Sequence, residues 1–174
     1  MQELFDIVDD DNNIIGTATR KEAHEKGFLH KSGIFFIFNK KGQLFMNRRS
    51  LKKEFEPGVF SLVLGGHVIK GDSYEQTVIR EAKEEAGITS KPHYLANFKS
   101  RFKEKDKENA ALYYFIIDHE PILDKTEIES GRFIDIDEIQ RMVKIGHFIR
   151  ETQVIYPLLL ENKEKILKAL AKHP

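Results

Sequence analysis

The pattern of apolar and polar positions along the chain predicts a central sheet. The continuous apolar run Ile34–Asn39 (IFFIFN) is typical of a strand in the middle of a sheet. Lys40–Gly42 is a turn, after which Gln43–Arg49 is expected to return as the partner strand. Leu51–Pro57 is then a charged loop, and Val59–Leu64 is predicted to be the next strand.

The N-terminal residues predict a hairpin over Glu3–Arg20, followed by a short helix. The hairpin turn is the polar run Asp9–Asn13, which lacks the Gly and the distal Glu of a calcium-binding loop and is therefore expected to be a plain turn. The short helix has Thr19 as its candidate N-cap, runs to Lys26 and is expected to stop at Gly27.

The C-terminal half is expected to complete the sheet. Tyr94–Phe102 and Ala111–Asp118 predict two antiparallel strands. The connection between them, Lys103–Asn109, is highly charged and expected to be a mobile loop. Phe133–Ile136 predicts a last strand.

Two helices are expected to follow that strand. Asp135 or Asp137 could cap a helix through Val143. Glu151–Ala171 predicts a C-terminal helix that is either kinked at Pro157 or begins there. The order of elements indicates one α/β domain over residues 1–174, in which a mixed sheet lies between helices, residues 1–30 form the N-terminal elaboration and residues 151–174 the C-terminal helix.

A further helix is predicted over Ser73–Ala86. Asp72 with Glu75 has the form of a capping box, and Gly87 is a natural stop. Glycines that precede the helix allow positive φ or close backbone approach to a ligand; they are Gly65, Gly66 and Gly71. An apolar stripe at four-residue spacing would face the core; it consists of Tyr74, Val78 and Ala82.

The same helix carries three carboxylates on one face. Glu81, Glu84 and Glu85 are spaced i, i+3 and i+4, and like charges at this spacing destabilise a helix. A hard divalent cation held by oxygen ligands would offset their repulsion. The alternative for such a face is that it is simply solvated.

The long spacing pattern around these carboxylates resembles the Nudix box, G-x5-E-x7-R-E-U-x-E-E-x-G-U, where U is aliphatic. The matching positions are Gly66, Arg80, Glu81, Ala82, Glu84, Glu85, Gly87 and Ile88. Asp72 departs from the pattern, because it stands where the first Glu is expected. The resemblance implies an α/β/α sandwich and a MutT-like hydrolase.

The resemblance also implies roles for individual residues. Glu81, Glu84 and Glu85 would bind Mg²⁺ or Mn²⁺, together with the Gly66 carbonyl, and Arg80 would orient a ligating Glu. The general base varies within the family and can come from a late loop. The candidates here are Glu127 and Glu129, and we predict Glu129. Arg48 and Arg49, at the exit of a strand, are either solvent-facing or clamp the diphosphate of the substrate.

A second resemblance narrows the subgroup to the type 1 isopentenyl-diphosphate isomerases and their Nudix relatives. It rests on the segments Asp9–His30, Asn47–Ser50, Pro57–Gly58 and Gly66–His67. The isomerase metal ligands would correspond to His24, His30 and His67, which we nevertheless expect to be structural. Gly65 stands where the isomerase needs its acid/base Cys, and Glu108 and Ala110 stand where it needs a pair of Glu.

Because Gly65 and Ala110 lack the side chains that the isomerase needs, we expect the protein to hydrolyse a diphosphate linkage in a nucleoside-diphosphate-linked or similar small substrate. The alternatives are a genuine isomerase and a catalytically weak module that binds a nucleotide. The charges balance at 28 basic and 28 acidic residues, which argues against a nucleic-acid partner. The chain has no Cys, no apolar run that could span a membrane and no signal-peptide pattern, so we expect a cytoplasmic protein. The sequence leaves open whether it is a monomer or a homodimer.

Overall fold

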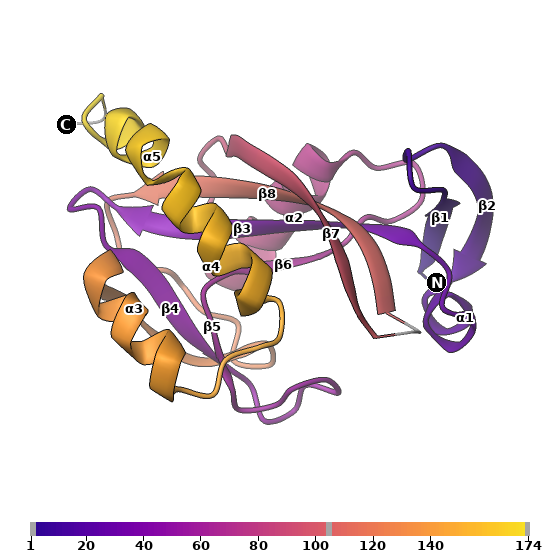
Figure 1. Cartoon of the computed structure of the whole chain (residues 1–174), viewed down its shortest axis with the longest axis horizontal. Coiled ribbons are helices and arrows are strands. Elements are labelled where there is room, and N and C mark those ends of the chain that lie inside the picture. The colour runs from indigo at the N-terminus through magenta and orange to yellow at the C-terminus, as the bar shows by residue number, and fades with distance from the viewer. Residues whose placement is uncertain (1–2, 104–105, 173–174) are drawn as a thin grey trace.

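The long strand β3 (His30–Asn39) is the axis of the larger sheet in the computed structural model, which describes residues 3–103 and 106–172 (Figure 1). On one side β3 pairs in parallel with β8 (Asp106–Ile117) along its whole length. On the other side it pairs with β6 (Leu64–His67) at one end, whereas β4 (Leu44–Arg49) meets it at the Phe38–Leu44 pair. The strands β4 and β6 therefore diverge, and this divergence opens the site described below.

The remaining strands are antiparallel to their neighbours. β7 (His93–Lys103) pairs with β8, while β5 (Phe60–Ser61) and β9 (Ile128–Ile134) both pair with β4. The main order is β5-β4-β3-β8-β7. Because only β3 and β8 run parallel among the paired strands of the described residues, the sheet is mixed, as predicted.

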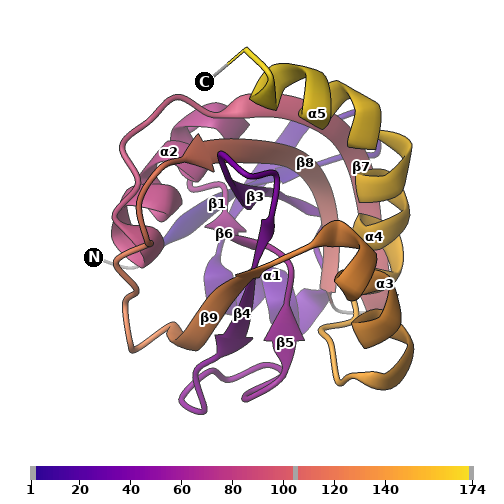
Figure 2. The same cartoon turned by 90° about the vertical axis from the view of Figure 1, so that its left-hand side faces the viewer.

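Helices cover both faces of this sheet (Figure 2). The continuous apolar run of β3 explains why, because alternate side chains of a strand point to opposite faces. Phe35 and Ile37 pack in one core with α2 (Tyr74–Ala86). Phe36 and Phe38 pack in the other core with the C-terminal helices, which are α3 (Ile136–Ile145), α4 (Thr152–Glu161) and α5 (Lys163–Leu170). The predicted α/β/α sandwich is confirmed.

The N-terminal hairpin and short helix are also confirmed. β1 (Leu4–Val8) and β2 (Ile14–Thr19) form a separate two-stranded sheet, and α1 (Arg20–Lys26) follows directly. Thr19 forms a full capping box with Glu22, and the helix ends at Gly27 with φ +65°. The hairpin turn is tied to the main sheet, since Asp10 accepts hydrogen bonds from Lys99 (2.9 Å) and Arg101 (3.1 Å).

The strand predicted at Val59–Leu64 is interrupted in the structure, because β5 ends at Ser61 and β6 begins at Leu64. The Asn47 side-chain amide donates to the carbonyls of Ser61 and Val63, both at 3.2 Å. The Ser61 hydroxyl also donates to the Val63 carbonyl at 2.8 Å. These side-chain bonds take the place of backbone bonds between strands at the point where the chain leaves β4 and joins β3. The prediction of one continuous strand was therefore wrong.

The helix ends differ from the prediction in two places. The N-cap of α2 is Ser73, whose capping-box partner is Gln76, so the assignment to Asp72 and Glu75 was wrong by one residue. The C-terminal helix is broken at Asn162, whose side-chain amide donates to the Leu158 carbonyl, and Pro157 lies inside α4 rather than at a helix start. Asp135 is the N-cap position of α3 but makes no side-chain capping bond.

The connection predicted as a mobile loop at Lys103–Asn109 is largely strand, because β7 extends to Lys103 and β8 begins again at Asp106. Positions 104–105 of that prediction lie outside the described residues. No helix in the described part of the chain is both long enough and apolar enough to span a membrane.

Candidate active site

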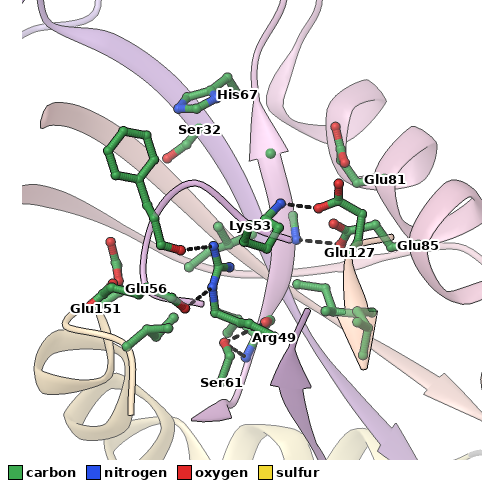
Figure 3. A pocket seen from close by; sticks show the side chains of 18 of the residues that line it. Ser32, Arg49, Lys53, Glu56, Ser61, His67, Glu81, Glu85, Glu127 and Glu151 are labelled. Atoms are coloured by element: carbon green, nitrogen blue, oxygen red, sulfur yellow. Dashed lines mark hydrogen bonds and ion pairs between the residues drawn. The ribbon is translucent and has the colours of Figure 1, made fainter. Parts of the chain in front are cut away.

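The cleft between the diverging strands has a volume of about 630 Å³. Its walls come from β3, β6 and α2 on one side and from the loop 50–58 on the other. Residues 124–128 and 149–155 contribute further lining, as do residues of the N-terminal unit, β4, the break between β5 and β6, and β8. Figure 3 shows Glu81 and Glu85 on one side of this cleft, Glu56 on the opposite side, and Arg49 and Lys53 between them.

The wall formed by α2 is acidic and partly dehydrated. Glu85 is only 8% exposed and accepts a hydrogen bond from the Gly65 backbone N–H at 3.2 Å. Burial, reinforced by the charge of Glu81, raises the pKa of Glu85 to about 8. Burial also raises the pKa of Glu81, although Arg80 acts against it. Adding a cation to this wall would therefore relieve an unfavourable concentration of negative charge.

The position of Glu81 explains the glycine before it. A Cβ at Gly66 would lie 2.5 Å from Glu81 Oε1, so a side chain at residue 66 would displace this carboxylate. Arg80 donates to Glu81 Oε1 at 2.5 Å and lies 3.6 Å from Glu84 Oε2. The Arg80 guanidinium also reaches the His67 carbonyl at 3.5 Å. Arg80 thus joins the box helix to β6, and Glu84, with a side chain 61% exposed, lies at the outer edge of the acidic face.

The two candidates for the general base lie in different environments. Glu127 lines the cleft and forms an ion pair with Lys53, and its charge acts on Glu85. Glu129 does not belong to the cleft lining and lies 3.5 Å from the Arg48 guanidinium. The cleft lining therefore contains Glu127 and not the predicted Glu129. The two residues lie on either side of Ile128, the first residue of β9.

The arginine pair mainly holds the loop 50–58. Arg48 donates through Nε to the Gly58 carbonyl at 3.0 Å, and its side chain is 45% exposed outside the cleft lining. Arg49 lines the cleft, but its Nε and Nη2 donate to the carbonyls of Glu56 (3.1 Å) and Phe55 (2.9 Å). Lys53, which the sequence interpretation did not single out, places a cation opposite the acidic wall.

The structure also gathers the three histidines at the cleft. Ligand nitrogens of His24, His30 and His67 all lie within 4.8 Å of one another. Glu108 joins them, with Oε1 3.2 Å from His67 Nε2 and 3.8 Å from His30 Nε2. Burial alone would raise the pKa of Glu108, but the hydrogen bond from His67 and the two imidazoles lower it to about 2. Ala110, the other isomerase position, is a buried core residue.

Two groups of residues in the cleft are chemically suited to metal ions. The carboxylates of Glu81, Glu84 and Glu85 provide hard oxygen donors whose repulsion a divalent ion would offset. The histidine cluster provides nitrogen donors with one carboxylate, a set that suits Zn²⁺ or Mn²⁺. The donor chemistry of the acidic wall therefore fits the Mg²⁺ or Mn²⁺ expected from the sequence.

The α/β/α sandwich, with an acidic helix beside a charged cleft, is the arrangement expected of a Nudix-type fold. Comparison with known proteins tests this assignment. A family model described as the NUDIX domain matches residues 29–153. An uncharacterized Nudix hydrolase of Clostridium acetobutylicum is 35% identical over 153 residues, which cover 83% of this chain and 70% of the relative. The chain belongs to the Nudix family, as an enzyme of the pyrophosphohydrolase class.

The chain is also similar to an isomerase and to a solved structure that shares its fold. Isopentenyl-diphosphate Delta-isomerase 1 of Photorhabdus laumondii is 28% identical over 144 residues, covering 79% of this chain and 82% of the isomerase. A crystal structure of a Deinococcus radiodurans protein superposes with a TM-score of 0.74 at 23% identity, covering 89% of this chain and 98% of the other. Nudix hydrolases generally use a divalent metal and act on small molecules.

Proposed function

We propose that this enzyme hydrolyses a diphosphate linkage in a nucleoside-diphosphate-linked or similar small molecule, using Mg²⁺ or Mn²⁺ at Glu81, Glu84 and Glu85. The observation that carries the proposal is the pairing of a buried acidic wall with cations in one cleft. Glu85 is nearly inaccessible and has a raised pKa, while Lys53 and Arg49 lie across from it. Such an arrangement suits a metal-bound diphosphate, which carries charges of both signs.

The reaction divides into roles for residues of this chain. A bound divalent ion would supply charge neutralisation of the phosphate oxygens and a more acidic water. Lys53 and the guanidinium of Arg49 would bind phosphate oxygens on the opposite side. Glu127, drawn into the cleft by its ion pair with Lys53, would accept a proton from the attacking water. The water oxygen bonds to one phosphorus, and the bridging oxygen leaves with the other phosphate.

The first experiment identifies the substrate and the bond. Diphosphate compounds are incubated with the enzyme and Mg²⁺ or Mn²⁺, and the products are identified by mass. Two phosphate-bearing products that depend on the added metal are expected from at least one nucleoside-diphosphate-linked compound. If no compound turns over while nucleotides still bind, the alternative of a catalytically weak binding module is correct.

A second experiment separates the two candidate bases. A general base contributes roughly 10²–10⁴-fold to the rate, so Glu127→Gln should lower kcat by that factor. Glu129→Gln is the matched change two residues away, outside the cleft lining and beside Arg48. Loss of activity in Glu129→Gln with full activity in Glu127→Gln would restore the assignment made from the sequence.

One observation favours the isomerase alternative, namely the convergence of His24, His30 and His67 with Glu108. Another opposes it. Gly65 has φ +139°, and a Cβ there would lie 2.2 Å from the Gly33 carbonyl oxygen. The acid/base side chain that the isomerase needs at this position therefore has no space in this backbone. Hydrolysis remains the function we propose.

A further inference from the structure

Asn47 is a buried polar residue of the cleft. It lies in β4, lines the cleft and is only 2% exposed. Its side-chain amide donates to two backbone carbonyls, those of Ser61 and Val63, both at 3.2 Å. A carbonyl only accepts hydrogen bonds, so these two contacts require both hydrogens of the amide nitrogen. Neither Asp nor Leu, which are similar in size to Asn, could supply either bond.

The two carbonyls belong to the segment in which the chain passes from β5 to β6. Ser61 is the last residue of β5 and pairs with Asn47 across the sheet. Val63 belongs to neither strand, and its carbonyl also accepts a hydrogen bond from the Ser61 hydroxyl at 2.8 Å. The Asn47 amide therefore joins β4 to the residue directly before β6, at the point where the two strands diverge.

Beyond this link, the two strands carry different parts of the site. β6 continues to Gly65, whose N–H donates to Glu85 at 3.2 Å, and the pairing of β6 with β3 holds this residue in place. β4 continues to Arg49, which lines the cleft and donates to carbonyls of the loop 50–58 (Figure 3). The spacing between the acidic wall and Arg49 therefore depends on the contact at Asn47, whereas β3 holds the acidic wall itself.

We infer that Asn47 is a positioning residue, whose amide sets the spacing between the acidic wall and Arg49 so that one metal-bound diphosphate contacts both. The inference rests on the proposed function. A divalent ion alone would contact only the acidic wall, whereas the diphosphate bound to it would also reach Arg49. Since small errors in the placement of binding groups are costly, loss of the Asn47 amide weakens the ligand that spans the two groups and spares the ion. A residue that only stabilised the fold would not distinguish these two ligands.

The test compares two ligands and does not depend on turnover. Dissociation constants are measured for Mn²⁺ alone, by electron paramagnetic resonance of the free ion, and for imidodiphosphate with saturating Mn²⁺, by calorimetry. The bridging nitrogen of imidodiphosphate resists hydrolysis. Asn47→Leu should change the Mn²⁺ constant less than about twofold and weaken imidodiphosphate binding by roughly 10- to 150-fold, the range for a lost hydrogen bond to a charged group. Asn47→Thr, which suits a strand and keeps one donor, should show the same contrast and serves if the Leu variant does not fold.

Asn162→Leu is the matched control, because the Asn162 amide donates to the Leu158 carbonyl at 2.9 Å between α4 and α5, outside the cleft lining. This variant should lower the free energy of unfolding in urea and leave both dissociation constants unchanged. The inference is overturned if Asn47→Leu weakens both ligands equally or neither of them, if wild type does not bind imidodiphosphate, or if neither Asn47 variant folds. A wild type whose imidodiphosphate affinity depends on Asn47, but which hydrolyses no diphosphate, would instead overturn the proposed function.

Discussion

Replacing Glu85 with Gln is expected to stabilise the metal-free protein while abolishing its turnover. Gln keeps the shape of the side chain and an oxygen that accepts from the Gly65 N–H, and it removes the buried charge. The folded protein holds the Glu85 proton up to about pH 8, whereas the unfolded chain releases it near pH 4.5. The free energy of unfolding of wild type should therefore fall as pH rises between these values.

The structure gives the size of this effect. A rise from 4.5 to about 8 in the pKa of a carboxylate that is 8% exposed corresponds to at most roughly 5 kcal/mol, at about 1.4 kcal/mol per unit. Water and side chains relax around a buried charge, so we expect the Gln variant to be more stable by about 2 kcal/mol above pH 8. At pH 4.5 and below, the two proteins should be equally stable.

The assay is urea unfolding with a chelator present, at intervals between pH 4.5 and pH 8.5. Glu84→Gln is the matched control on the same helix face; its side chain is 61% exposed, so a change under about 0.5 kcal/mol is expected. With Mg²⁺ present, Glu85→Gln should lose roughly 100-fold or more of the metal-dependent rate. Parallel pH profiles for wild type and Glu85→Gln would refute the buried-charge argument, and wild-type turnover in both variants would refute the metal assignment.

Three further predictions concern the neighbouring residues. Gly65→Ala should lower the free energy of unfolding by more than about 2 kcal/mol, because the added Cβ meets the β3 backbone. Gly71→Ala, at φ +87° with nothing within 4 Å, should lower it by only about 1 kcal/mol through backbone strain. Equal losses in the two variants would contradict the steric argument. Isopentenyl diphosphate in deuterated water with Mg²⁺ should show no deuterium at its allylic carbons by NMR, and any incorporation would favour the isomerase. Added Zn²⁺ should shift the Tm of wild type and of His67→Ala equally if the three histidines are structural, as expected from the sequence; a larger rise in wild type would show that the converging imidazoles bind the ion.

Local patterns in the sequence were sufficient wherever the determining contacts are local. The apolar run of β3 predicted a strand buried on both faces, and the structure buries Phe35 and Phe36 completely in opposite cores. The spacing of Glu81 and Glu85 predicted a shared helix face for the same reason, because a regular helix fixes which residues are neighbours. Even the hairpin turn and the α1 capping box follow from hydrogen bonds within a few residues.

Predictions at the ends of elements were less accurate, because competing local partners differ little in energy. Ser73 with Gln76 caps α2 in place of Asp72 with Glu75, and both pairs have acceptable capping chemistry. The break between β5 and β6 depends on Asn47, which lies far from it in sequence. Within the segment 59–64 only the bonds between Ser61 and Val63 are local, and the contribution of Asn47 is not visible there.

The composition of the cleft was decided by the tertiary structure alone. Whether Arg49 holds a loop or faces a phosphate depends on the path of residues 55–58, and the choice between Glu127 and Glu129 depends on the register of β9 against β4. The histidine cluster requires α1, β3 and β6 to meet, which adjacent residues do not specify. The sequence by itself determined the box helix and its chemistry, because these depend on spacing along one element. The rest of the site, with Lys53, Phe55 and Glu127, comes together because β4 diverges from β3, and that divergence follows from pairing between distant strands.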